Sequence, residues 1–101
     1  VVIVKVNGYA NEESFGAIDG DLKKHILGGR ENVCFDFSEC KLINSPGLTA
    51  FIEIVLYVKD DCFGKVFACG LSPLIRDIFS IAGLPSMLQT FETVEEAISN
   101  F

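Results

Sequence analysis

The sequence predicts an α/β fold with a small, mostly parallel sheet and about four helices. Strand-like and helix-like segments alternate four times along the chain, and the links between them are short. Such alternation is typical of right-handed crossovers between parallel strands. The 101 residues, half of them apolar, supply enough side chains for one core but not for two. We therefore expect a single domain over residues 1–101.

The first half of the chain predicts two strands with a helix between them. Residues 1–6 are rich in β-branched side chains, and residues 32–37 alternate in a way that places Val33, Phe35 and Phe37 on one face. The helix should begin near Asn11. Its apolar stripe comprises Phe15, Ile18, Leu22 and Ile26, and Gly28-Gly29 should end it.

A loop is expected before Pro46, followed by a second helix over about residues 46–59. Because parallel strands end at one edge of a sheet, this loop should lie where ligands and partners usually bind. The expected apolar arc of the helix comprises Leu48, Phe51, Ile52, Ile54, Val55, Leu56 and Val58. The opposite ridge comprises Thr49, Glu53 and Tyr57.

The second half predicts two more strands and two more helices. Residues 65–69 and 87–91 have strand composition, and a helix over residues 71–82 should lie between them. Its inward side chains are expected to be Leu74, Ile75, Ile78, Phe79 and Ile81, with Gly83 as its stop. Thr93 and Glu96 form a capping box that predicts a short last helix.

Composition argues against several classes of function. The net charge of −6 opposes nucleic-acid binding, and no segment approaches the ~20 apolar residues of a membrane span. The four cysteines form no Cys-x-x-Cys pair and His25 stands alone, so we expect no metal site. No glycine-rich phosphate loop precedes a helix, so no cofactor is expected. The absence of a signal peptide and the reading of the cysteines as reduced core thiols predict a cytoplasmic protein.

Ser45 has two possible roles. Ser followed by Pro is favoured at a helix start, with Ser as the N-cap and Pro as the first helical residue. Ser72-Pro73 repeats the pattern before another helix, so capping alone gives Ser45 no special function. A phosphate on Ser45 would add roughly −1.5 to −2 charge at a helix N-terminus without breaking the helix. Such a modification would alter partner binding and leave the fold intact.

The segment FDFSECKLINSPGLTAF resembles the corresponding segment of STAS domains, the fold of bacterial anti-sigma factor antagonists. In that family a strand leads through a loop to Asp-Ser-(Ser or Thr)-Gly-Leu and a helix. The resemblance extends to GKVFACGLSPLIRDIFSIAGL and to VNGYAN, which is similar to an early Gly-x-x-Asp. STAS domains usually have one further strand before this point, and that strand is expected to be missing here.

The resemblance implies a non-catalytic adaptor that binds an anti-sigma factor in its unphosphorylated form and so frees a sigma factor. The anti-sigma factor is a serine kinase that phosphorylates the motif's first Ser, which matches Ser45, and a serine phosphatase reverses the reaction. The chain departs from the motif at three positions. Asn44 and Asn11 stand where the family has Asp, and Pro46 stands where it has Ser or Thr.

The sequence suggests two other functions. A cysteine phosphatase needs Cys and Arg separated by five residues, whereas Cys69 and Arg76 are separated by six. A STAS-type scaffold or accessory subunit of a transporter or stress-signalling complex would need no phosphorylation, and the three departures from the motif favour it. For either adaptor the expected contact face comprises Asn11, Asn44, Ser45, Pro46, Gly47, Leu48, Thr49 and Glu53, with Tyr57 continuing the ridge.

Overall fold

The computed structural model describes residues 1–25 and 31–101, and it confirms the predicted α/β class. A four-stranded sheet has the order β1-β3-β5-β6, and every neighbouring pair is parallel. Its strands are β1 (Val2–Lys5), β3 (Asn32–Asp36), β5 (Lys65–Cys69) and β6 (Gln89–Phe91). The predicted end of the first helix at Ile26 and Gly28-Gly29 lies outside the described residues.

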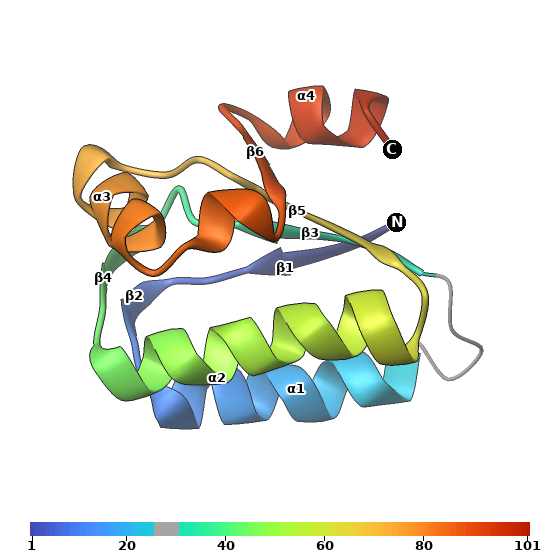
Figure 1. The fold of residues 1–101 in the computed structure, drawn as a ribbon, viewed down its shortest axis with the longest axis horizontal. Helices are drawn as coiled ribbons and strands as arrows, with labels where there is room; N and C mark the ends of the chain where they lie inside the picture. Colours follow the sequence, from blue (N-terminus) through green and yellow to red (C-terminus); the bar gives the residue numbers. More distant parts are fainter. Residues whose placement is uncertain (26–30) are drawn as a thin grey trace.

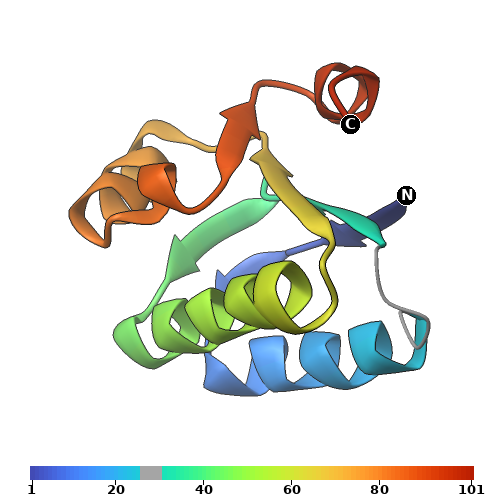
Figure 2. The ribbon, with the colours of Figure 1, turned by 45° about the vertical axis from the view of Figure 1, so that its right-hand side comes forward.

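Helices cover both faces of this sheet (Figure 1). The helices α1 (Glu12–His25) and α2 (Ser45–Leu56) lie side by side on one face, and α4 (Val94–Ser99) lies on the other. The helix α3 (Pro73–Ile81) packs beside the strands at one end, as Figure 2 also shows. A π-helical turn, η1 (Tyr57–Asp61), continues α2, and a short 3-10 helix, η2 (Leu84–Ser86), precedes β6.

Two short strands were not predicted. The strands β2 (Gly8–Ala10) and β4 (Cys40–Ile43) form a separate parallel ladder. The prediction of a loop before Pro46 is therefore wrong for residues 40–43. Each strand pairs only with the other within this ladder. Segments of three and four residues are too short to show a clear alternating pattern. Ala10 and Ile43 point into the core, while Tyr9 and Leu42 are exposed.

The core is centred on Phe51 of α2, whose side chain is fully buried. Its ring centroid lies 5.4 Å from that of Phe15, 5.0 Å from that of Phe35, 5.3 Å from that of Phe37 and 5.6 Å from that of Phe79. These rings come from α1, β3, the residue after β3, and α3. One side chain therefore joins both helices of one layer to the sheet and to α3.

The predicted shared face of Val33, Phe35 and Phe37 is confirmed, because all three side chains lie in one core cluster. Residues 33–37 are all buried, because β3 is a central strand with helices on both faces. Three burial predictions on the helices were wrong. Leu56, Leu74 and Ile81 are exposed, not inward-facing. The helix α3 packs at the edge of the sheet and buries only a narrow stripe, Ile75 and Phe79.

Other local predictions are confirmed. Ser72 caps α3 by accepting a hydrogen bond from the amide of Ile75, and Thr93 caps α4 by accepting one from the amide of Glu96. Gly83 follows the end of α3 with φ +77°, a conformation that favours glycine. The four cysteines are free and buried, as expected for core thiols.

Candidate partner-binding site

Ser45 is exposed at the first position of α2, but it is not the N-cap that the sequence predicted. Asn44 has the extended cap conformation, and its Oδ1 accepts a hydrogen bond of 2.8 Å from the amide of Gly47. Asn is at least as good a cap as Ser, and Pro46 is tolerated in the first turn because it needs no amide partner. The Ser45 hydroxyl is therefore not used for capping.

The start of α1 lies beside the start of α2. Asn11 is part-buried immediately before α1, and its Oδ1 accepts hydrogen bonds from the amide and the hydroxyl of Ser14 at 2.8 Å and 3.0 Å. The amide of Asn44 donates to the carbonyl of Ala10 across the β2–β4 ladder at 3.2 Å. The ladder thus brings together the two Asn side chains that the sequence placed on one contact face.

Two of the expected contact residues point inward. Gly47 is buried against the backbone of Asn11, so it positions the two helix starts and offers no surface to a partner. Leu48 is half-buried and packs against the core. Asn44, Ser45, Pro46 and Thr49 are exposed around the first turn of α2. The Thr49 hydroxyl donates to the carbonyl of Ser45 at 3.2 Å, which ties the ridge to the serine.

The rest of the ridge borders a groove between α1 and α2. The groove has a volume of about 280 Å³, and its lining includes Glu12, Asp19, Lys23, Glu53 and Tyr57. Lys23 Nζ lies 3.0 Å from Asp19 Oδ2 and 5.2 Å from the centroid of the Tyr57 ring. Tyr57 is therefore half-buried against α1 and does not extend the outward ridge. Glu53 is exposed at the groove edge, beyond Thr49.

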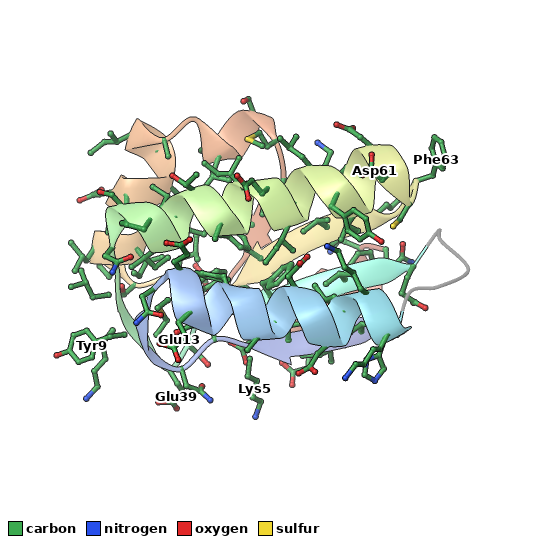
Figure 3. All side chains as sticks on the ribbon, turned by 90° about the horizontal axis from the view of Figure 1, so that it is seen from below. Lys5, Tyr9, Glu13, Glu39, Asp61 and Phe63 are labelled. Atoms are coloured by element: carbon green, nitrogen blue, oxygen red, sulfur yellow. The ribbon has the colours of Figure 1, made fainter. Side chains whose placement is uncertain are left out.

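Two further exposed side chains lie next to these residues and were missed by the sequence analysis. Tyr9 is 70% exposed and pairs across the ladder with Leu42, which is 39% exposed. Figure 3 places Tyr9 at the end of the molecule where α1 and α2 begin. Tyr9 and Leu42 are each followed by one core residue and then by an Asn at a helix start. This repeated pattern, Tyr-Ala-Asn and Leu-Ile-Asn, is the one sequence feature that the two positions share.

The first turn of α2 leaves few amides for a phosphate on Ser45. Pro46 has none, the amide of Gly47 binds the Asn44 side chain, and the amide of Leu48 donates to the Asn44 carbonyl. A phosphate would be attracted by the positive end of the helix dipole, but it would find few free amides in the first turn to bind. Its charge would remain exposed to a partner.

The cysteine that a phosphatase would need is chemically unsuited to that role. Cys69 is fully buried at the end of β5, whereas Arg76 is exposed on α3. Burial, together with the nearby Cys34, raises the pKa of the Cys69 thiol to about 12. A nucleophilic cysteine needs a lowered pKa, so the structure opposes this reaction at Cys69.

Comparison with known proteins finds one family. A family model of the STAS domain matches residues 1–97. A candidate anti-sigma factor antagonist of Bordetella bronchiseptica, BtrV, is 23% identical over 101 residues, which cover all of this chain and 86% of that protein. Within the part of the chain that the structure describes, no helix is long and apolar enough to cross a membrane.

Two solved proteins share the fold. A candidate anti-sigma factor antagonist of Thermotoga maritima superposes with a TM-score of 0.84 at 16% identity, covering 97% of this chain and 84% of that one. The anti-sigma factor antagonist SpoIIAA superposes with a TM-score of 0.73 in its unphosphorylated form, at 17% identity with 97% and 86% coverage. The phosphorylated form of Bacillus SpoIIAA gives the same TM-score, at 19% identity with 97% and 87% coverage. The present fold is thus similar to both forms of that protein.

Proposed function

Since the chain belongs to the STAS domain family, we propose that it acts as an anti-sigma factor antagonist. In its unphosphorylated form it binds an anti-sigma factor that is also a serine kinase, and this binding releases a sigma factor. The observation that carries the proposal is the exposed hydroxyl of Ser45 at the first position of α2, beside the start of α1.

The proposed contact face consists of Asn11, Asn44, Ser45, Pro46, Thr49 and Glu53, supported from behind by Gly47 and Leu48. Tyr9 and Leu42 add an exposed apolar pair at its border. Apart from Glu53, the polar side chains of this face are uncharged, and its border carries an aromatic side chain, a type enriched at protein–protein interfaces. The amides at Asn11 and Asn44 provide hydrogen-bonding groups without the charge of the family's Asp residues.

Phosphorylation of Ser45 is proposed as the off-switch. The kinase transfers the γ-phosphoryl group of ATP to Ser45 Oγ, leaving ADP and a proton, and a serine phosphatase hydrolyses the phosphoester to reset the protein. The dianion weakens binding by charge repulsion and by the cost of removing its water at the contact face. Because few amides of the first turn are available to the phosphate, α2 is expected to keep its structure.

The test is incubation with the candidate kinase and ATP, read by intact mass and by binding calorimetry. We expect a gain of one phosphate that is lost in Ser45→Ala, and weaker binding by Ser45→Asp and Thr49→Arg. Ser99→Asp on α4, which covers the opposite face of the sheet, is the matched control and should bind like the wild type. Unchanged affinity for both Ser45→Asp and Thr49→Arg would show that the face is wrongly placed.

A second function is favoured by the two departures that flank Ser45. The Asn44 side chain caps the helix, and Pro46 fixes the backbone beside the serine. A kinase that selects the family's Asp-Ser-(Ser or Thr) pattern would therefore meet a different surface. The alternative is a STAS-type scaffold in a transporter or stress-signalling complex. In the same experiment, tight binding without any gain in mass supports the scaffold and contradicts the switch.

A further inference from the structure

Phe63 occupies a position that the fold itself does not explain. It follows the π-helical turn η1 and the buried Cys62, its φ is +54°, and it is 76% exposed. A bulky residue at positive φ is strained. Because the Phe63 ring is exposed, no burial of the ring offsets that strain. Gly64, which follows, packs so closely on Glu31 that a Cβ there would lie 2.2 Å from the Glu31 carbonyl oxygen. The anchored neighbours therefore hold the Phe63 ring out in solvent (Figure 3).

An apolar groove with two lysines in its lining lies directly beside Phe63. Its volume is about 300 Å³, and it runs from Gly64 and Lys65 across to η2 and the start of β6. Its apolar lining comprises Val66, Phe67, Pro85, Met87 and Leu88. Its charged lining is Lys59, whose Nζ donates to the Met87 carbonyl, and Lys65. The groove is thus a basic and apolar site on a chain of net charge −6.

The groove and the segment beside it are complementary to each other. Asp60 and Asp61 are exposed on the turn that leads to Phe63, so negative charge lies beside the aromatic ring. Lys59 and Lys65 line the groove, so positive charge lies beside its apolar residues. We call Asp60, Asp61 and Phe63 the tip. A two-fold axis beside the tip would place the tip of each copy in the groove of the other, because an isologous contact uses the same surface twice.

We propose that the tip and the groove form a homodimer contact, with a second copy of this chain as the occupant. Phe63 is the buried anchor, and pairs of Asp60 and Asp61 with Lys59 and Lys65 surround it, an arrangement typical of interface hot spots. Ser45 and the tip lie at opposite ends of α2 and η1 (Figure 1). Dimerisation by this contact leaves the Ser45 face of both copies free.

Sedimentation equilibrium of the 11.0 kDa chain over a concentration series tests this proposal. The wild type should reach twice the monomer mass, and Phe63→Gly should raise the dissociation constant roughly thirtyfold, the loss expected for a hot-spot anchor. Glycine also suits the positive φ, so this variant should keep its fold and, compared at concentrations where both proteins are monomeric, its melting temperature. Ile81→Ser, which removes an even more exposed apolar side chain from α3, should dimerise like the wild type.

A charge exchange makes the test specific to the proposed geometry. Lys65→Glu and Asp61→Lys should each weaken self-association, because each places like charges across the contact. An equimolar mixture of the two variants should form a heterodimer, because both contacts are then between opposite charges. A wild type that stays monomeric at millimolar concentration overturns the proposal. Dimers that survive Phe63→Gly, or a mixture that does not associate, also overturn it.

Discussion

Gly47 on α2 packs directly against the backbone of Asn11 at the start of α1. A Cβ at Gly47 would lie 2.8 Å from the Asn11 Cα and 2.9 Å from the Ala10 carbonyl oxygen. Real Cβ atoms essentially never approach that closely, so the contact requires glycine although its φ is unexceptional. The distance between the two helix starts is therefore fixed by the missing side chain, and with it the spacing of Asn11 and Ser45 on the proposed face.

The first prediction is that Gly47→Ala destabilises the protein by about 1–3 kcal/mol, the usual cost of overpacking against backbone. Gly20→Ala in the middle of α1 is the matched control, because nothing lies within 4 Å of a Cβ there. It should stabilise the protein by about 0.5–1 kcal/mol through helix propensity. Urea unfolding measures the free energy of unfolding of both variants. Equal effects of the two substitutions would contradict the close contact between Gly47 and the backbone of Asn11.

The second prediction separates the cap from the phosphorylation target. Asn44→Ala should lose about 1 kcal/mol of unfolding free energy, because the Gly47 amide loses its acceptor. Asn44→Asp keeps an acceptor at the same place and should retain most of the stability. Ser45→Ala should change stability by less than about 0.5 kcal/mol, since its exposed hydroxyl caps nothing. A larger loss from Ser45→Ala than from Asn44→Ala would restore Ser45 as the cap.

The cap shows where sequence reasoning was sufficient and where it failed. Ser72 and Thr93 were assigned correctly, because neither is preceded by another good capping residue. At α2 two good caps, Asn44 and Ser45, stand side by side, and propensity cannot choose between them. The choice follows from the β2–β4 ladder, which holds Asn44 in extended conformation through its bond to Ala10. That ladder pairs segments far apart in the sequence, such as Ala10 with Ile43, so no local pattern predicts the pairing.

The third prediction concerns the aromatic cluster. Phe51→Ala should cost about 3–5 kcal/mol, because a fully buried ring that contacts four other rings leaves a cavity that its rigid neighbours cannot fill. Phe63→Ala, measured on the monomer at low concentration, should change stability by less than about 0.5 kcal/mol. Thermal unfolding at one protein concentration compares them. Similar losses for both would show that Phe63 is not exposed as described.

Burial on helices was predictable only where a helix crosses the middle of the sheet. The arc predicted for α2 and η1 was largely correct, since Phe51, Ile54, Val55 and Val58 are buried. The same period applied to α3 failed at Leu74 and Ile81, because the width of a buried stripe depends on what lies beneath the helix. Phe63 has no sequence pattern that marks it as exposed, because its positive φ and the exposure of its ring depend on how the neighbouring residues pack.

The last prediction concerns the pH dependence of stability. Burial, the nearby Cys34 and other negative groups raise the pKa of Cys69 from 9.0 to about 12 in the folded protein. The two sulfur atoms lie 3.8 Å apart. As pH rises above 9 the unfolded chain releases this proton while the folded protein keeps it. The unfolded state then binds fewer protons, so the unfolding free energy falls as pH rises, until the folded pKa is reached.

Urea unfolding at intervals between pH 8 and pH 11 measures this decline. The wild type should lose up to about 1.4 kcal/mol per pH unit through Cys69, beyond the contribution of all other groups. Cys69→Ala should decline less steeply, because the variant has no thiol there to titrate. Val66→Ala, which truncates another buried side chain of β5 but removes no titrating group, should decline like the wild type. Parallel curves for wild type and Cys69→Ala would mean that the folded protein does not raise the pKa of this thiol.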